Sequence, residues 1–419
     1  MAESLKVLMM GGPRSGKTSV LAGLVDSMIN GEVKQFLSVK DVTEGDAVKQ
    51  KLAQKTVNLK QTLLSAVGKT ILVDDSKTAA YQHYTIEFAI PGTEDKLNII
   101  FTDANGEFFE SGRGEYESEI SKMLKDYDVF IIAIDTPSLM EAINPENSLM
   151  NEPLCKAINN INDITNFIPY LDDKEGADAK MVIFVPLKCE KWAHEGKLDL
   201  VSNRVQQVYA TPISTLKSKK NVEIDILPIQ TVGNIVFKEH LKSYVCLSQG
   251  ADSPKRCSLL ENNAIVRFAN GEEREFNKSS DKIKFDPNAP IKEGSPILRP
   301  NSWFEVINTE YAPHNCDLLA FYTLQFILSK FLFLKEVEQK KKEEKQKEHS
   351  YIYLAIIAIV AYFSWPIALI CYLASKALDY FGSISYEELH KVLNAIKEKN
   401  LIKTDEEGVY QVKKTLLSI

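Results

Sequence analysis

Gly11-Gly12-Pro13-Arg14-Ser15-Gly16-Lys17-Thr18 is the stretch that decides the fold, because it fits the GxxxxGK[ST] pattern of a phosphate-binding loop. The apolar run Leu5–Met10 before it predicts a buried strand, and the helical spacing of Ser15–Ile29 after it predicts a helix. Glycines let such a loop wrap a phosphate with its N–H groups inward, and the helix N-terminus adds positive potential. Strand, loop and helix are all present, so the sequence predicts a nucleotide-binding site here.

Each residue of this loop has an expected place in the site. The predicted nucleotide-binding residues are Gly11, Gly12, Pro13, Arg14, Ser15, Gly16, Lys17, Thr18 and Ser19. Lys17 is expected to place its charge on the β- and γ-phosphates, which also makes it a predicted catalytic residue. The Thr18 hydroxyl is a predicted ligand of Mg²⁺, the expected cofactor.

A second motif follows another apolar run. Leu97–Thr102 reads as a buried strand that ends in Asp103, with Gly106 three residues further on. An acid at the carboxyl end of a strand beside the loop can hold the metal through its water shell, so Asp103 is a predicted metal residue. Gly106 supplies a backbone N–H that can sense a γ-phosphate, and it is a predicted catalytic residue. Together with the loop, this DxxG motif favours a GTPase-type switch over an ordinary ATPase.

The two motifs resemble those of the small-GTPase-like branch of P-loop proteins, over roughly residues 5–334. The resemblance implies that Glu107 stands where small GTPases usually carry the glutamine that orients the attacking water. A glutamate there can accept a proton from water, or it is a surface residue in a salt bridge. Arg113 and Arg14 are candidates for an internal arginine finger, with a solvated loop arginine as the simpler alternative.

The resemblance also implies a switch threonine that binds the metal. We expect this residue to be Thr78, because it lies in a polar loop a few residues before the alternating strand Gln82–Ile90. Thr70 and Thr85 are the rival positions.

Guanine-binding proteins of this class usually carry [NT]KxD after a strand in the second half of the sheet. Here the strand Met181–Val185 runs into Pro186-Leu187-Lys188-Cys189-Glu190, so Lys188 and Glu190 are the predicted base-binding residues. Leu187 stands in place of the usual Asn or Thr, and Glu190 in place of the usual Asp. A carboxylate suits guanine, whose N1 is a donor, better than adenine, whose N1 is an acceptor. The alternative is that both are solvated strand-end charges. Thr231 and Val232 are expected to touch the base edge through the backbone.

Alternation of apolar strands with helices predicts an α/β fold, a three-layer P-loop sandwich with a mostly parallel sheet. A β-rich insertion and an apolar helical C-terminal segment add to it. The expected parts are a GTPase-like domain at 1–334 with a helical insertion at about 41–69 and a β-rich insertion at about 244–301, a charged connector at 335–349, an apolar hairpin or transmembrane segment at 350–382, and a small C-terminal domain at 383–419.

The composition indicates a globular protein and limits the classes of partner that it can bind. The chain has 419 residues, 44% hydrophobic and 26% charged, with a net charge of −7, so it is globular and long enough for two or three domains. The acidic balance argues against a nucleic-acid partner. The six cysteines form no CxxC pair, which indicates reduced thiols in a cytosolic setting.

Tyr351–Ser375 contains no charged residue over 25 positions. As a helix it would be about 37 Å long, which exceeds the roughly 30 Å of a bilayer's hydrocarbon core. Pro366 interrupts it, so a transmembrane helix, a re-entrant hairpin and an apolar hairpin buried in protein or in an oligomer interface all stay open. We expect a cytoplasmic nucleotide domain attached to the inner face of a membrane through this segment.

A narrower resemblance rests on Gly106-Glu107, Lys188-Cys189-Glu190 and the stretch Tyr311–Asp317. These resemble bacterial GTPases encoded in gene clusters for biological conflict or defence, including the double-GTPase systems. The resemblance implies a GTP-binding and GTP-hydrolysing switch, slow without a partner, that works with a partner GTPase and effector proteins. The rival functions are an ATP-driven P-loop enzyme and a non-catalytic, nucleotide-binding membrane scaffold.

Overall fold

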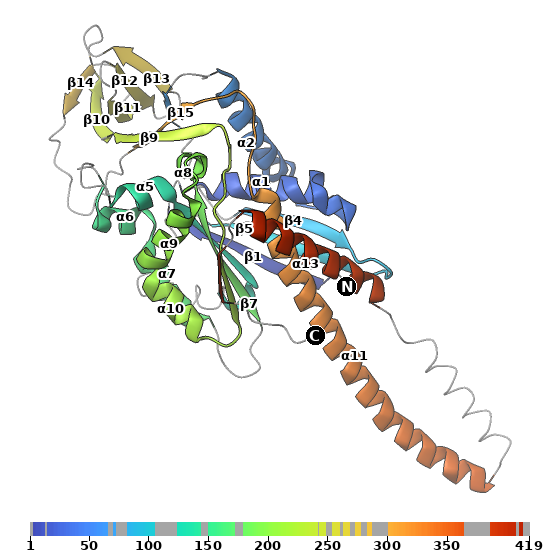
Figure 1. The fold of residues 1–419 in the computed structure, drawn as a ribbon. Coiled ribbons are helices and arrows are strands. Elements are labelled where there is room, and N and C mark those ends of the chain that lie inside the picture. The colour runs from blue at the N-terminus through green and yellow to red at the C-terminus, as the bar shows by residue number, and fades with distance from the viewer. Residues whose placement is uncertain are drawn as a thin grey trace.

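The computed structural model describes residues 3–12, 15–65, 70–72, 82–104, 124–143, 150–171, 179–241, 243–248, 254–259, 263–268, 273–277, 283–286, 301–363, 386–407 and 410–413. Its centre is an eight-stranded sheet in the order β16-β8-β7-β6-β1-β5-β4-β2 (Figure 1). The strands are β1 (Glu3–Gly11), β2 (Ser38–Asp41), β4 (Gln82–Ala89), β5 (Lys96–Asp103), β6 (Val129–Asp135), β7 (Lys180–Leu187), β8 (Val222–Ile226) and β16 (Tyr410–Lys413).

The middle of this sheet is parallel, because β1 pairs with both β5 and β6, and β7 pairs with both β6 and β8, all in parallel. The strands β4, β2 and β16 are added antiparallel. Every residue of β6 and β7 is buried, as expected where helices cover both faces. In β1, Leu5, Val7 and Met9 enter one core while Leu8 and Met10 enter the other.

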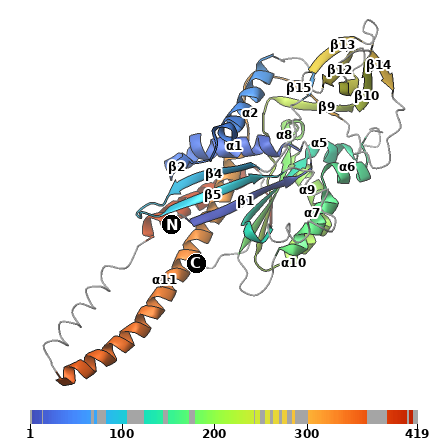
Figure 2. The same ribbon diagram turned by 180° about the vertical axis from the view of Figure 1, so that it is seen from behind.

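Helices cover the two faces of the sheet and complete three layers (Figures 1 and 2). One face carries α1 (Lys17–Asn30), α11 (Cys316–Phe363) and α13 (Glu387–Glu407), with η1 (Glu32–Gln35) and α2 (Asp46–Ser65) packed beside α1. The other face carries α5 (Thr136–Glu141), α6 (Glu152–Ile158), α7 (Ile161–Phe167), η2 (Ile168–Tyr170), α9 (Leu198–Val208) and α10 (Ala210–Ser218). The predicted α/β fold with a mostly parallel sheet is thereby confirmed.

Two helical stretches that cover the sheet are each divided into two shorter helices. Residues 152–167 form α6 and α7, separated at Asn159 and Asn160, and Asn160 takes a left-handed φ of 49°. Asparagine tolerates this conformation, and the break lets the Asn159 side chain turn toward the sheet. Residues 198–217 form α9 and α10, which meet at Tyr209.

Two smaller sheets lie at one end of the molecule (Figure 1). The five-stranded sheet has the order β13-β12-β11-β10-β14 and the three-stranded sheet the order β3-β15-β9. Their strands are β3 (Thr70–Leu72), β9 (Ile235–Leu241), β10 (Ser243–Ser248), β11 (Pro254–Leu259), β12 (Asn263–Phe268), β13 (Glu273–Asn277), β14 (Ile283–Asp286) and β15 (Asn301–Val306). Five of these strands fall within the stretch where the sequence predicts a β-rich insertion, and α2 falls within the predicted helical insertion.

The C-terminal part is built differently from the division that the sequence suggests. The helix α11 runs unbroken through the boundaries placed at 334/335 and 349/350, because the Lys- and Glu-rich stretch between them is itself a good helix former. The helix α13 buries Leu389, Leu393 and Ile396 in the same core as α11, and β16 joins the main sheet beside β8. The described residues of the predicted small C-terminal domain are therefore parts of the main body and do not form a unit of their own.

One described helical stretch, Cys316–Lys341, is long and apolar enough to cross a membrane, with a mean hydropathy of 1.5. Because 78% of its apolar window is buried inside the protein, this stretch is a core helix. Within the predicted segment Tyr351–Ser375, residues 351–363 continue α11, and 364–375 lie outside the described residues.

Candidate nucleotide-binding site

The carboxyl ends of four neighbouring strands meet at one edge of the main sheet. In the registers, Gly11 of β1 lies opposite Ala133 of β6, and Asp103 of β5 lies opposite Met9. Further along, Asp135 of β6 pairs with Leu187 of β7. Ligands of open α/β sheets bind outside this edge, and here it collects the phosphate-loop and base-motif residues that the sequence predicts.

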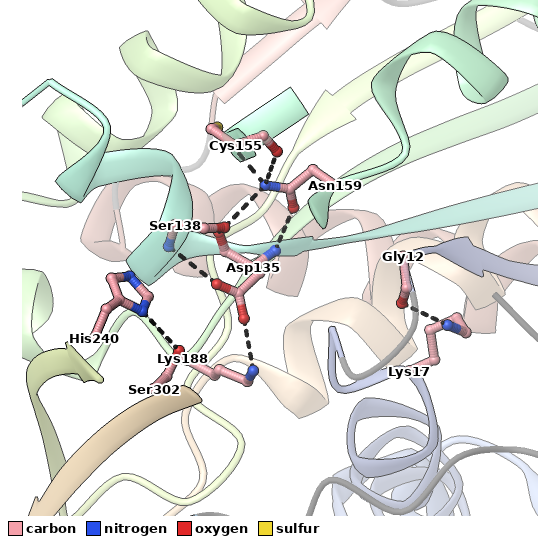
Figure 3. Close-up of polar contacts among 9 residues, drawn as sticks. All are labelled: Gly12, Lys17, Asp135, Ser138, Cys155, Asn159, Lys188, His240 and Ser302. Carbon is pink, nitrogen blue, oxygen red and sulfur yellow. Dashed lines mark hydrogen bonds and ion pairs between the residues drawn. The ribbon is translucent and has the colours of Figure 1, made fainter. Parts of the chain in front are cut away.

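The loop after β1 is shaped by its glycines. Gly11 has a φ of 132°, and a Cβ there would lie 2.4 Å from the carbonyl oxygen of Ala133, so only glycine fits. The Lys17 Nζ donates to the carbonyl oxygen of Gly11 at 3.0 Å. It also donates to that of Gly12 at 2.9 Å (Figure 3). The Ser15 hydroxyl is buried and has no hydrogen-bond partner among the described residues, as expected beside a binding loop. Pro13 and Arg14 lie outside the described residues.

Two of the three predicted metal residues, which come from separate motifs, are in direct contact. The Thr18 Oγ1, on the first turn of α1, donates to the Asp103 Oδ2 at 2.6 Å, and Asp103 is fully buried. A hydroxyl and a carboxylate side by side are the oxygen ligands that Mg²⁺ prefers. The described residues contain no cluster of three or more His, Cys, Asp or Glu side chains that could hold a metal.

Several predicted residues cannot be placed. Thr78, Gly106, Glu107 and Arg113 lie outside the described residues. The rival switch threonines both belong to strands: Thr70 begins β3, and the N–H of Thr85 in β4 donates to the Thr43 hydroxyl at 3.0 Å.

The base motif begins where β7 ends. Lys188 takes a left-handed φ of 58°, which turns the chain into α8 (Glu190–His194). A Cβ placed on Gly16 would lie 3.1 Å from the Leu187 Cδ1. Leu187, which replaces the usual Asn or Thr, thus packs directly on the phosphate loop, and the two motifs form one site.

Lys188 is held by an acid that the sequence analysis missed. Its Nζ lies 2.6 Å from the Oδ2 of Asp135, and both side chains are mostly buried (Figure 3). Burial acts to raise the pKa of Asp135, but the Lys188 ammonium and the Ser138 amide outweigh it and hold that pKa below its ordinary value. A signal was present in the sequence, because Asp135 ends a wholly apolar run, as Asp103 ends a mostly apolar one.

A network of hydrogen bonds fixes the position of Asp135 (Figure 3). Its backbone N–H donates to the Asn159 Oδ1 at 2.7 Å, and its Oδ1 accepts from the Ser138 N–H at 3.0 Å. The Asn159 Nδ2 donates to the Ser138 Oγ at 3.1 Å, which closes the network. The break between α6 and α7 therefore places the Asn159 side chain beside Asp135 at the end of β6.

Glu190 is buried behind Lys188, with only 1% of its surface exposed. Burial raises its pKa to about 7, and the backbone N–H groups of Glu190, Val232 and Gly233 offset part of that rise. Those groups do not reach hydrogen-bond geometry, so both carboxylate oxygens lack a partner among the described residues. Two buried acceptors without donors match the N1–H and N2–H₂ groups of guanine.

The loop that follows β8 faces Glu190. It contains Thr231 and Val232, both buried, and Gly233 with a φ of 88°. The stretch 311–315 fixes this loop from outside: Gln230 and His314 exchange backbone hydrogen bonds, and the Ala312 N–H donates to the Val232 carbonyl at 3.1 Å. A Cβ on Gly233 would lie 1.9 Å from the Ala312 carbonyl oxygen.

A second residue outside the predicted set reaches this site from the three-stranded sheet. His240 of β9 is buried near Asp135, and the Ser302 hydroxyl of β15 lies 3.3 Å from its Nδ1 (Figure 3). Burial lowers the pKa of His240, while the Asp135 charge acts in the opposite direction. No motif spacing in the sequence marks this histidine, because it comes from a strand outside the main sheet.

The phosphate loop between β1 and α1, the Thr18–Asp103 contact and the order of the main sheet define a P-loop protein of the GTPase type. Residues 7–211 match the sequence model of the family described as Double-GTPase 2, and the match is consistent with a P-loop GTPase of that type. The match supports guanine-nucleotide binding and, in general terms, GTP hydrolysis.

Comparison with curated proteins found no match. Among solved structures, similarity was found to Sup35 complexed with GMPPNP, at 9% identity and a TM-score of 0.23 over 73% of this chain and 68% of that one. Sup35 complexed with GDP gave 7% identity and a TM-score of 0.24 over 73% and 67% of the two chains. Likenesses this weak support no conclusion about this chain.

Proposed function

We propose that the protein binds GTP together with Mg²⁺ and hydrolyses it as a slow molecular switch. The observation that carries the proposal is the 2.6 Å contact between Thr18 and Asp103, which joins the phosphate loop to the end of β5 at the sheet edge. Mg²⁺, when bound there, supplies positive charge to the phosphate oxygens. Thr18 would hold it directly, and Asp103 would hold it through its water shell.

The chain's own residues account for phosphate binding and for charge stabilisation. The Lys17 Nζ donates to the loop carbonyls of Gly11 and Gly12, and this position inside the loop supports its assignment to the β- and γ-phosphates. Together with the loop N–H groups it stabilises the negative charge that develops as water attacks the γ-phosphate. Gly106 and Glu107 are proposed to sense that phosphate and to orient the water.

Base selection is assigned to Lys188 and Glu190. The Lys188 stem is proposed to cover the guanine ring while Glu190 accepts from N1–H and N2–H₂, with the backbone of Thr231 and Val232 at the base edge. Support comes from the buried, unpartnered carboxylate oxygens of Glu190, which would be costly to leave without donors.

Equilibrium displacement of a fluorescent GDP analogue from the full chain, combined with phosphate release, tests this function. GTP and GDP should compete while ATP does not, and binding should need Mg²⁺. Lys17→Ala should lower phosphate release about a hundredfold or more, and the exposed Lys34→Ala is its matched control. Equal competition by ATP would favour the ATP-driven enzyme, and a release rate that Lys17→Ala leaves unchanged would favour the nucleotide-binding scaffold.

We further propose that this switch works at the inner face of a membrane, with a partner GTPase and effector proteins, in a bacterial defence system. The uncharged stretch Tyr351–Ser375 supports the membrane part. The family description, a double GTPase, supports a GTPase partner. The GTPase partner is tested by asking whether a second GTPase co-purifies with the tagged full chain and whether this depends on the bound nucleotide.

A further inference from the structure

The first half of α11 is anchored in the body of the protein. Between Leu318 and Leu332 it contributes buried side chains to the core that β1, β5 and α1 share. The Lys330 Nζ donates to the Asp128 Oδ1 at 2.6 Å, and both side chains are almost fully buried. The point at which α11 leaves the body is therefore fixed.

The chain returns to the same body after residues 364–385. The Tyr386 hydroxyl donates to the Asp95 Oδ2 at 2.8 Å, and its ring meets Phe331 of α11 edge-on at 6.3 Å between centroids. From there α13 packs into the same core as α11. The strand β16 then pairs with β8, with Tyr410 opposite Ile226. Both flanks of the uncharged segment thus belong to one folded unit.

Between these anchors α11 projects away from the body. Both views show its distal part as a stalk that extends beyond the sheet and its covering helices (Figures 1 and 2). From residue 342 to 363 the helix is about 33 Å long at ~1.5 Å per residue. Its charged residues end at Glu348 and His349, so the uncharged residues Tyr351–Phe363 form the far end of the stalk.

We infer that this stalk tip inserts into the near leaflet of a lipid bilayer and that the chain returns on the same side, so the protein is monotopic. The inference rests on the membrane association proposed above and specifies its topology. A single span is incompatible with the fold, because it would place α13 and β16 across the membrane from the sheet that β16 extends.

The dimensions of the tip fit partial insertion. Tyr351–Phe363 is about 20 Å long as a helix, which is shorter than the roughly 30 Å hydrocarbon core. Pro366 follows shortly and lacks the N–H that a continuing helix needs. Tyr351 and Tyr353 stand at the junction of the charged and uncharged parts, where tyrosines sit at a membrane interface.

Flotation of the full chain with vesicles of phosphatidylethanolamine and phosphatidylglycerol tests whether the stalk tip binds a lipid bilayer. The protein should float with the vesicles, and Ile357→Lys should weaken that association about tenfold or more, because a charge at bilayer depth is costly. The control is Leu64→Lys, which places the same charge on an exposed leucine of α2 and should float like the wild type. If the Ile357→Lys variant floats as well as the wild type, the tip is not the part that inserts.

Thiol labelling of the floated protein tests the topology. Lys347→Cys and Lys391→Cys place one thiol on each flank, and the unsubstituted chain gives the background. A membrane-impermeant reagent should label both positions to the same extent before and after detergent. Protection of either flank would overturn the monotopic arrangement while leaving membrane association standing. Protein that does not float, and that sediments as a dimer joined through its tips, would overturn the membrane association itself. Neither result would change nucleotide binding, so the proposed GTP binding is tested separately.

Discussion

The Nζ of Lys188 lies 2.6 Å from the Oδ2 of Asp135, and this contact ties the carboxyl end of β7 to that of β6. Lys188 reaches it from a left-handed backbone conformation, and Asp135 is held in turn by Asn159 and Ser138. The stem of Lys188 is thereby fixed across the edge of the sheet at which we place the base.

Asp135→Asn should weaken binding of a fluorescent GDP analogue by about tenfold, because it removes a charge-assisted hydrogen bond to the lysine that covers the base. The matched control is Glu141→Gln, which makes the same chemical change in the pair of Glu141 with Lys191 on the neighbouring helices. An affinity unchanged in Asp135→Asn, or lowered equally in Glu141→Gln, would contradict a positioning role for Asp135.

Asp103→Asn should raise the Mg²⁺ concentration needed for half-maximal GTP binding by about ten- to a hundredfold, the usual cost of losing a group that orients a metal's ligands. A Mg²⁺ titration of nucleotide binding measures it. Asp126→Asn is the control, since Asp126 is largely exposed and lies before β6, away from the edge that carries the site. If both variants respond to Mg²⁺ alike, the metal is not held at Thr18 and Asp103.

Glu190 should make the stability of the nucleotide-free protein fall as the pH rises. Its pKa is about 7 in the folded protein against an ordinary value of 4.5, so between these values the folded state keeps a proton that the unfolded state has released. The free energy of unfolding therefore drops through this window, by about 3 kcal/mol in all, and then levels off above it.

Glu190→Gln removes that titration while keeping the shape of the side chain. Compared with the wild type in denaturant unfolding, it should gain about 3 kcal/mol at about pH 8 and close to nothing at about pH 4.5. Glu195→Gln, one turn further on and exposed, should leave the wild-type pH profile in place. A Glu190→Gln profile that keeps the same slope would show that Glu190 is ionised at neutral pH.

Lys330→Met should lower the free energy of unfolding by about 3–5 kcal/mol, because it leaves the Asp128 carboxylate buried without its cation. Adding Asp128→Asn should recover part of the loss, since the uncompensated charge is then gone. Lys335→Met, at a looser pair whose partner Glu338 is 55% exposed on the same helix, should cost at most about 1 kcal/mol. Chemical denaturation distinguishes these outcomes, and an equal loss at Lys330 and Lys335 would contradict a buried anchor.

Local patterns were sufficient to predict the parallel centre of the main sheet. The runs at 5–10, 97–102 and 181–187 contain few polar residues, and such strands occur where helices cover both sides of a sheet. The loop glycines and Lys17 were predictable for a similar reason, because the phosphate-binding role sets residue types at fixed spacing. Thr18 and Asp103 could be paired from the sequence, since both follow strands that the fold places side by side.

Contacts between distant parts of the chain could not be predicted from local sequence patterns. Asp135 was missed because its role depends on Lys188, more than fifty residues away, and on an asparagine freed by a break in a helix. The placement of β16 depends on a strand edge at β8 that no local pattern identifies as open. The burial of Glu190 depends on the loop that residues 311–315 fix in place.

The position of α11 in the core also has a consequence for how the protein is made. Val7, Leu24 and Met28 leave the ribosome long before Leu318–Leu332, the helix that shares their core. The nascent chain therefore carries every binding residue from Gly11 to Val232 while one apolar face of its sheet is covered only by α1 and its neighbours, without α11. Folding of this face is completed only late in synthesis, and until then the growing polypeptide has the exposed surface that chaperones recognise.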